Sequence, residues 1–296
     1  MADHGRNRRD LTVALAITAG YCLVELIGGW VTNSLALLSD AGHMFADVGA
    51  LSVSIFALHL AQRPPTASKT FGYHRVEILA AFVNGLVLWL IVGLIVREAY
   101  QRFFDPPAVR GAGMIAIAVV GLGVNLVSLW VLRRSQSTNL NLRAAFVHVL
   151  GDAFGSVGAV IAGAAILLRG WTLADPLVSI GIALLILISS WDIVRESVDI
   201  LMQGTPREMR LADIEACLRA IPCVCEVHDL HVWTLTSGRY LLSVHLVVAN
   251  DDTARPDGAR QVIDTAQTQL RERFGIGHTT VQVDAGAECS EEFRAH

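Results

Sequence analysis

The sequence predicts a helical membrane protein in which six transmembrane helices are followed by a smaller cytosolic α+β domain. Three observations predict this fold class. Only 17% of the 296 residues are charged, whereas soluble domains usually carry about a quarter. The mean hydropathy is +0.50. Long apolar segments fill the chain up to about residue 202, and the residues beyond it have the patterns of a soluble domain.

Six segments are long and apolar enough to be transmembrane helices, which need roughly 20 residues each. Breakers and charges separate them, such as the Pro64-Pro65 pair. The first segment is too long for the apolar part of a signal peptide, so we expect it to be retained. The predicted helices cover residues 11–32, 35–62, 76–98, 112–132, 142–168 and 177–200 of a membrane domain over residues 11–202.

The positions of Lys and Arg between these segments predict their orientation, because such residues are enriched on the cytosolic side. If the N-terminus is cytosolic, nine of them lie inside and four lie outside. The nine are Arg6, Arg8, Arg9, Arg63, Lys69, Arg75, Arg133, Arg134 and Arg143, and the four are Arg97, Arg102, Arg110 and Arg169. We therefore expect both termini in the cytosol, with residues 1–10 as a short cytosolic segment.

Residues 203–284 are expected to form the cytosolic domain, with helices and strands in the order αββαβ. Helical spacing predicts helices over 207–222 and 259–275, and β-rich runs predict strands over 224–236, 239–249 and 279–285. Residues 285–296 are expected to be a disordered tail. From Gln203 onward, nine Arg stand against fourteen Asp and Glu, and this acidic balance argues against nucleic-acid binding.

Two of the apolar segments contain the same H-x-x-x-D pattern, His43 with Asp47 and His148 with Asp152. Residues four apart share one face of a helix, so each pair can bind an ion through two ligands. Two such pairs on neighbouring helices would offer two imidazoles and two carboxylates, which suits the tetrahedral preference of Zn²⁺. Alternatively, each His and Asp merely forms hydrogen bonds within the bundle. Ionisable groups inside a membrane are usually functional, and the repeat favours a metal site.

Four stretches, which follow one another along most of the chain, carry a resemblance to a known family. They are "SLALLSDAGHMFAD" (34–47), "RPPTASKTFGYHRVEILAAFVN" (63–84), "NLNLRAAFVHVLGDAFGSVGA" (139–159) and "HDLHVWTLTSG" (228–238). On these residues the chain resembles the cation diffusion facilitator family, especially its bacterial zinc-type members. The resemblance implies a homodimer in a bacterial inner membrane that exports divalent metal from the cytosol in exchange for protons. It also implies that the cytosolic domain is ferredoxin-like and binds further metal.

The resemblance assigns the transport site to His43, Asp47, His148 and Asp152. A His at position 43 is typical of zinc-preferring members, and an Asp there would broaden the metal range. Zn²⁺ is thus the expected substrate and a regulatory ligand of the cytosolic domain, and no organic cofactor is expected. Cd²⁺ is the expected second substrate, while Co²⁺, Ni²⁺ and Fe²⁺ are left open.

The cytosolic domain contains a second set of candidate ligands, His228, His245 and Asp284. Because side chains alternate along a strand, His245 and Asp284 lie on the face opposite to their apolar neighbours. All three are either ordinary surface residues or ligands on one face of a sheet, and the resemblance places metal ligands at these positions. Gln282 stands where the family often has another His, so we expect one metal ion there rather than two.

Three further positions are left open by the sequence. Asp40, one turn before His43, could relay protons, steer the metal or hydrogen-bond a neighbouring helix, and we favour the last role. Glu25, in the first predicted helix, could be a structural partner or a relay for protons or metal. His74, in the second cytosolic loop, stands where some relatives hold an extra zinc ion. The acidic and His partners expected around it are missing.

Two other classes of function remain as alternatives. A metal-sensing membrane receptor would signal through the cytosolic domain and transport nothing, but the sequence contains no kinase, cyclase or DNA-binding segment. An intramembrane zinc hydrolase would need an open coordination position, a water molecule and a general base, and no H-E-x-x-H motif occurs. We therefore predict a secondary transporter rather than an enzyme.

Overall fold

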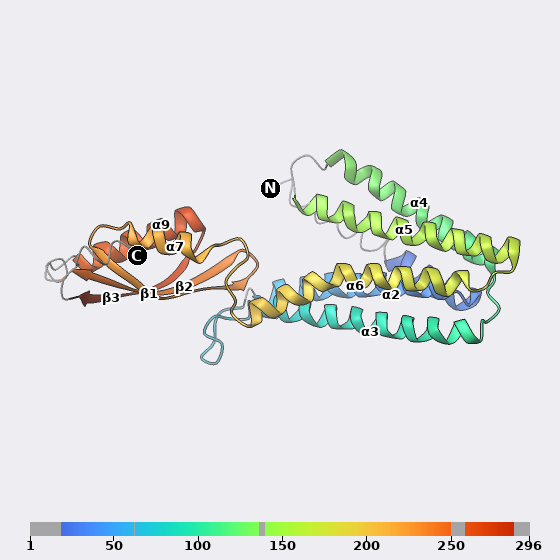
Figure 1. Cartoon of the computed structure of the whole chain (residues 1–296), viewed down its shortest axis with the longest axis horizontal. Helices are drawn as coiled ribbons and strands as arrows, with labels where there is room; N and C mark the ends of the chain where they lie inside the picture. Colours follow the sequence, from blue (N-terminus) through green and yellow to red (C-terminus); the bar gives the residue numbers. More distant parts are fainter. Residues whose placement is uncertain (1–18, 62, 136–139, 250–257, 287–296) are drawn as a thin grey trace. The chain divides into compact units, whose positions relative to one another are not determined.

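A computed structural model describes residues 19–61, 63–135, 140–249 and 258–286 of the chain (Figure 1). The chain divides into two compact units. Of the described residues, those up to 56 and those from 80 to 194 form the helical unit, and those from 57 to 79 and from 195 onward form the sheet unit. The predicted N-terminal segment, residues 1–10, lies outside the described residues, and so do residues 287–296 of the predicted tail.

Long helices make up the helical unit. A helix over Ala19–Thr32 precedes α2 (Leu35–Ala61), α3 (Val76–Phe104), α4 (Gly111–Ser135), α5 (Leu140–Arg169) and α6 (Ala174–Leu201). Within the described residues, four helical stretches are long and apolar enough to cross a membrane. They are α3, α6, Gly111–Trp130 of α4 and His148–Arg169 of α5.

The observed helices differ from the predicted ones mainly at their ends. Residues 11–18 of the first predicted helix lie outside the described residues. α3 continues to Phe104 instead of ending at residue 98. There, Arg102 donates a hydrogen bond to Glu98 at 3.1 Å, and such a pair four residues apart supports helix beyond the apolar run.

A buried carboxylate from α6 caps the start of α2. Ser34 Oγ donates to Asp175 Oδ1 at 2.6 Å, and the backbone N–H groups of Leu35 and Ala36 donate to the same carboxylate at 2.7 and 3.1 Å. A helix cannot satisfy its own first four N–H groups, so they need partners from elsewhere. Asp175 therefore does for α2 what an N-cap residue usually does within one helix.

Arg102 joins α3 to this cap. Its guanidinium donates to Asp175 at 3.3 Å and to the Asn33 carbonyl at 2.8 Å. Asp175 is fully buried, and the Arg102 side chain is only 8% exposed. The buried ion pair thus fixes the beginning of α2, on which His43 and Asp47 lie one turn apart.

Glycines allow close approach between helices of this unit. A Cβ on Gly111 of α4 would lie 2.8 Å from the carbonyl oxygen of Gly163 on α5, which leaves no room for a side chain. Gly155 of α5 faces α2, since a Cβ there would lie 3.8 Å from Asp40 Oδ1. Apolar side chains fill the remaining space, and buried examples are Leu37, Leu88, Met114, Ile182 and Ile186.

The sheet unit has its elements in the order αββαβ. α7 (Leu211–Arg219) is followed by β1 (Val224–Thr236), β2 (Arg239–Ala249), α9 (Gly258–Phe274) and β3 (His278–Gly286). In the sheet order β1-β2-β3, β1 is antiparallel and β3 is parallel to β2. α7 starts later than predicted because Arg210 has an extended backbone. β3 runs through Gly286, beyond residue 285 where the disordered tail was expected to begin.

α7 and α9 lie on the same face of the sheet (Figure 1). Ile214 of α7 and Leu270 of α9 pack with strand residues such as Leu246, and all three are almost fully buried. Because side chains alternate along a strand, His245 faces away from this core. The open face of the sheet is therefore available for polar side chains.

The 57–79 segment belongs to the sheet unit and contacts the β1–β2 hairpin. Glu77 accepts hydrogen bonds from Thr236 Oγ1 at 2.6 Å and from Ser237 Oγ at 2.7 Å. The next residue, Gly238, has a φ of +69°, a conformation that glycine adopts without strain. The turn thus presents both hydroxyls to the Glu77 carboxylate.

Candidate functional site

His43, Asp47, His148 and Asp152 meet between α2 and α5. Nε2 of His43 lies 3.6 Å from Asp47 Oδ2 and 3.6 Å from Asp152 Oδ1. Nε2 of His148 lies 3.3 Å from Asp47 Oδ2 and 3.7 Å from Asp152 Oδ2. The two imidazole rings are packed edge to face, with centroids 5.3 Å apart. Each imidazole thus faces both carboxylates, and the two H-x-x-x-D motifs form one cluster, which we call the membrane cluster.

The distances within the membrane cluster suit one tetrahedral cation. Zinc lies about 2.0–2.2 Å from His nitrogen and carboxylate oxygen, so donor atoms at the corners of a tetrahedron are about 3.3–3.6 Å apart. The four His–Asp distances are 3.3–3.7 Å. One donor atom each from His43, Asp47 and His148 lies within 4.8 Å of the others. Asp152 lies outside this group of three, and it offers a different oxygen to each imidazole.

The membrane cluster lines a cavity of about 1030 Å³. The His43 side chain is 11% exposed, whereas the His148 side chain is 43% exposed. Asn84, Ser189 and Asp192 line the same cavity. Two carboxylates balance the charge of one buried dication, and the open cavity allows the ion to exchange with solvent. The cluster therefore has the chemistry to bind a divalent metal reversibly.

Asp40 and Glu25 are buried carboxyl groups of the helical unit. Asp40 lines the same cavity and is 6% exposed, and Glu25 is 1% exposed. Glu25 Oε2 is fully buried and has no hydrogen-bond partner among the described residues. The sequence singled out both residues, and neither belongs to the groups of metal-ligating side chains found within the described residues.

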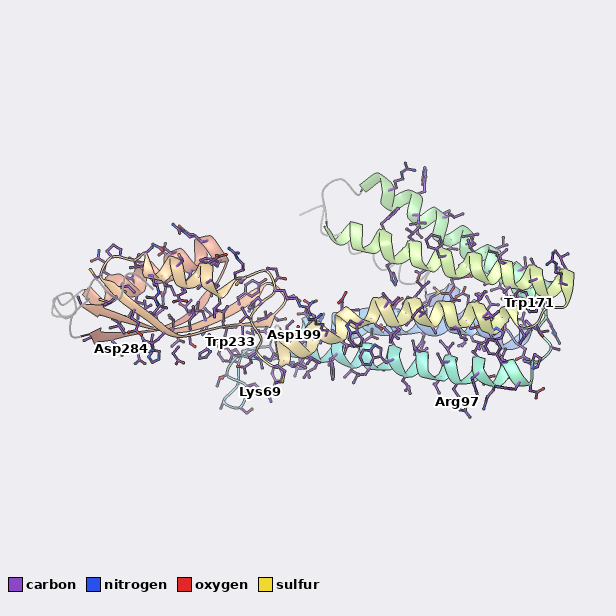
Figure 2. The ribbon with its side chains drawn as sticks, viewed as in Figure 1. Lys69, Arg97, Trp171, Asp199, Trp233 and Asp284 are labelled. Atoms are coloured by element: carbon purple, nitrogen blue, oxygen red, sulfur yellow. The ribbon has the colours of Figure 1, made fainter. Side chains whose placement is uncertain are left out.

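In the sheet unit, His228, His245 and Asp284 come together on the open face of the sheet. Nδ1 of His245 lies 3.2 Å from Asp284 Oδ2, and the rings of His228 and His245 have centroids 5.1 Å apart. One donor atom of each residue lies within 4.8 Å of the other two. Figure 2 labels Asp284 on β3. We call these three residues the cytosolic cluster.

Gln282 and His245 lower the pKa of the Asp284 carboxyl. Gln282 donates to Asp284 Oδ1 at 2.9 Å, and this hydrogen bond, followed by the nearby His245, holds the pKa of the Asp284 carboxyl below its ordinary value. Gln282 stands where the sequence suggested that a family histidine is missing. Here it orients and stabilises a candidate ligand without itself being one.

Asp229 is a neighbour of the cytosolic cluster that sequence reasoning missed. Its carboxylate lies 3.0 Å from His231 Nε2 and 3.8 Å from His245 Nε2. Asp229 has a φ of +51°, and the pairing of β1 with β2 shifts between His228 and His231. An acid directly after His228 was the only signal in the sequence. Asp229 and Asp284 contact opposite nitrogens of His245, so Asp229 can orient that ring while the other nitrogen binds metal.

His74 has a different environment from the two clusters. Arg239 donates a hydrogen bond to His74 Nε2 at 3.0 Å, and the two side chains line a hollow of about 420 Å³ together with Phe71 and His278. Within the described residues, His74 belongs to neither group of metal-ligating side chains. The adjacent guanidinium repels cations, so the geometry gives no support to zinc binding at His74.

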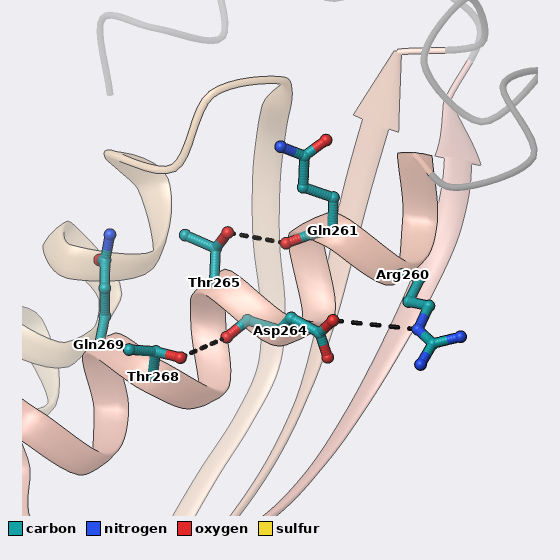
Figure 3. A pocket seen from close by; sticks show the side chains of 6 residues that line it. All are labelled: Arg260, Gln261, Asp264, Thr265, Thr268 and Gln269. Atoms are coloured by element: carbon teal, nitrogen blue, oxygen red, sulfur yellow. Dashed lines mark hydrogen bonds and ion pairs between the residues drawn. The ribbon is translucent and has the colours of Figure 1, made fainter.

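A further hollow, of about 650 Å³, lies along the outer side of α9 (Figure 3). Its side chains mainly interact within their own helix. Thr265 and Thr268 donate to the carbonyls of Gln261 and Asp264 at 2.7 and 2.8 Å, and Arg260 lies 3.9 Å from Asp264. Such contacts are typical of an exposed helix, and we assign no function to this hollow.

A helical unit with a His/Asp cluster on a cavity, followed by a sheet unit with a second such cluster, defines a metal-handling membrane protein. Comparison with family models gives the family. The cation efflux transmembrane domain matches residues 11–202, and the cytoplasmic domain of cation efflux proteins matches residues 206–286. The chain belongs to the cation efflux family, which confirms the predicted resemblance to cation diffusion facilitators.

Relatives of known name resemble almost the whole chain. It is 42% identical over 287 residues to the cadmium, cobalt and zinc/H(+)-K(+) antiporter of Bacillus subtilis, with 96% of this chain and 91% of the relative covered. It is 43% identical over 280 residues to the zinc transporter ZitB of Escherichia coli, with 94% and 88% covered. The solved metal-bound C-terminal domain of the CzcD transporter from Cupriavidus metallidurans is 38% identical, covers 26% of this chain and 99% of that domain, and has a TM-score of 0.23.

Proposed function

We propose that this protein is a secondary transporter that exports Zn²⁺ from the cytosol in exchange for protons. The observation that carries the proposal is the membrane cluster, whose four His–Asp distances of 3.3–3.7 Å match the edges of a zinc tetrahedron. His43, Asp47, His148 and Asp152 are the transport ligands. The names of the antiporter and zinc transporter relatives support the same substrate class. Cd²⁺ is the second substrate, since imidazole ligands favour borderline and softer metals.

Exchange with protons follows from competition for the same atoms. Zinc binds neutral imidazole and ionised carboxylate, so each ligand must lose its proton before the metal binds. In the proposed alternating-access cycle, the cluster takes Zn²⁺ from the cytosol and the helices then rock to open outward. Protons from the outside displace the metal. Histidine suits this task because its ordinary pKa lies close to the pH of most cellular compartments.

The proposed architecture has six transmembrane helices over residues 11–202 and a ferredoxin-like domain over residues 203–284. Both termini lie in the cytosol, the membrane is the bacterial inner membrane, and the protein is a homodimer. Four apolar helical stretches within the described residues, the αββαβ order and the two family models support this arrangement.

Zn²⁺ is also the proposed regulatory ligand of the cytosolic cluster. His228, His245 and Asp284 supply its donor atoms, and the mutual distances of these atoms support this assignment. No organic cofactor takes part in the proposed cycle. His74 remains a candidate zinc ligand only through the family resemblance.

Zinc flux into dye-loaded proteoliposomes, driven by an imposed pH gradient, tests this function. We expect His43→Ala, Asp47→Ala, His148→Ala and Asp152→Ala each to lower flux at least tenfold. His59→Ala is a matched control, because it removes an exposed imidazole from the same helix, α2, and should leave flux unchanged. Undiminished flux after replacement of all four ligands would contradict the proposal. Zinc binding without any flux would instead favour a metal-sensing receptor.

A further inference from the structure

The hollow beside His74 lies within the sheet unit. It has a volume of about 420 Å³ and is lined by residues of the 57–79 segment, the β1–β2 hairpin and the turn between α9 and β3. Pockets that bind small organic molecules usually measure about 300–1,000 Å³, so this hollow has room for such a molecule. The proposed transport cycle makes no use of it.

The charges around this hollow distinguish it from the other cavities. Among the described residues that line it, Arg239 is a cation and none has a carboxylate. By contrast, four aspartates line the cavity of the membrane cluster, and Asp264 lines the hollow along α9. A cationic hollow without carboxylates attracts anions. The ligand that suits it is therefore negatively charged.

Two nearby groups that would repel an anion have other partners. The Glu77 carboxylate accepts hydrogen bonds from two hydroxyls of the β1–β2 hairpin. The last carbonyls of a helix carry partial negative charge. At the end of α9, the carbonyls of Leu270 and Arg271 accept the backbone N–H groups of Ile276 and Gly275. These hydrogen bonds satisfy the oxygens and reduce their repulsion of a ligand in the hollow.

The contact between Arg239 and His74 leaves hydrogen-bond donors for a ligand. A guanidinium can only donate, so His74 Nε2 accepts the 3.0 Å bond, and a neutral imidazole that accepts there carries its hydrogen on Nδ1. Arg239 has five N–H groups, and among the described residues it has no carboxylate partner. Its remaining N–H groups suit a phosphate group, which a guanidinium binds through two parallel hydrogen bonds.

Aromatic side chains provide the apolar part of the wall. The Phe71 ring is packed edge to face against the His278 ring, with centroids 5.7 Å apart, and Phe71 is 50% exposed. Tyr240 lines the same hollow. Ligand pockets commonly combine aromatic walls with a few polar groups that fix the orientation of the ligand. This combination suits a phosphate that is attached to an organic group better than inorganic phosphate.

We propose that this hollow binds a phosphate ester, with Arg239 as the main contact to the phosphate. The ester is either a small soluble molecule or the headgroup of a phospholipid, since His74 stands two residues before α3, which is apolar enough to span a membrane. The ligand contacts both the 57–79 segment and the β1–β2 hairpin, so it reinforces the contact that Glu77 makes between them. This site does not depend on the proposed transport of zinc.

Two binding measurements on the full-length protein, in a detergent without phosphate, test the proposal. Isothermal titration with glycerol 3-phosphate tests the soluble source, and native mass spectrometry with added phosphatidylglycerol tests the lipid source. In at least one of them, we expect Arg239→Gln to bind about tenfold more weakly than the unmodified protein, because it loses charge-assisted hydrogen bonds. Arg260→Gln is the matched control. It removes the same charge from the hollow along α9, where Asp264 is present, and should leave binding unchanged.

The measurement with the tighter binding identifies the source of the phosphate ester. Absence of binding in both measurements would overturn the proposal, and so would equal affinities of the two variants. If Arg239→Gln does not fold, modification of the unmodified protein by phenylglyoxal, located by mass spectrometry, replaces it. Each bound probe should slow the modification of Arg239 and not that of Arg260. Equal modification of Arg239 with and without both probes would likewise overturn the proposal.

Discussion

Replacing Asp175 by Asn should destabilise the helical unit strongly, because the buried Arg102 would keep only the partly exposed Glu98 as a counter-charge. Asp175 is fully buried and accepts hydrogen bonds from Ser34, Leu35 and Ala36 in addition to the guanidinium. An Asn side chain keeps only one accepting oxygen. Removing one partner of a buried ion pair typically costs about 3–5 kcal/mol. We therefore predict a loss of about 3–5 kcal/mol in the free energy of unfolding for Asp175→Asn.

The control is Asp199→Asn, which breaks an exposed ion pair. Asp199 lies 2.9 Å from Arg207, and the two side chains are 51% and 46% exposed. Exposed pairs contribute about 0–1 kcal/mol, so this variant should be nearly as stable as the unmodified protein. A double variant, Arg102→Gln with Asp175→Asn, removes the buried charge that has lost its buried partner and should regain part of the lost stability.

Thermal unfolding in detergent, followed by tryptophan fluorescence at one fixed heating rate, measures these differences. Asp175→Asn should unfold at a much lower temperature than Asp199→Asn, and the double variant should lie between them. Equal unfolding temperatures for the two single variants would refute the reasoning, because burial of the ion pair would then make no difference to the free energy of unfolding.

Three further predictions concern the two clusters and the hairpin contact. His43→Asp should raise Mn²⁺ flux relative to Zn²⁺ flux, because carboxylate ligands suit harder cations, and metal-by-metal transport assays should detect the change. The pKa of Asp284 is lowered in the folded state, so its contribution to stability is present above the unfolded-state pKa and is lost as the pH falls through the folded-state pKa. Denaturation midpoints of Asp284→Asn should therefore fall less on acidification than those of the unmodified protein. Glu77→Ala loses two hydrogen bonds to the β1–β2 hairpin, and trypsin should then cleave after Lys69 faster. Equal cleavage rates would mean that these contacts do not hold the 57–79 segment.

The repeated spacing of His and Asp made the membrane cluster predictable. Two residues four apart lie on the same face of a helix whatever surrounds that helix, so both ligand pairs could be read directly from the chain. The meeting of α2 with α5 required the family resemblance. Strand alternation likewise predicted the open-face position of His245, and the β2 bounds agree with the predicted strand over 239–249.

Contacts between distant residues were not predictable from spacing. Asp175 lies in the first turn of its own helix, yet the hydroxyl it binds belongs to Ser34, 141 residues earlier. The contact of Arg239 with His74 likewise joins residues 165 positions apart. The position of the Asp229 side chain depends on a left-handed backbone conformation at an irregularity of β1, which no local sequence pattern predicted. Tertiary packing alone brings these residues to their partners.

X-ray absorption at the zinc edge tests the central claim most directly, on full-length protein in which His228 and His245 are replaced by Ala so that metal binds at the membrane cluster. The account predicts four light-atom ligands at about 2.0–2.1 Å, two of them with the multiple-scattering pattern of imidazole. That imidazole signal should halve in a further His148→Ala variant. A spectrum with six oxygen ligands, or one that is unchanged by replacing both His43 and His148, would contradict it.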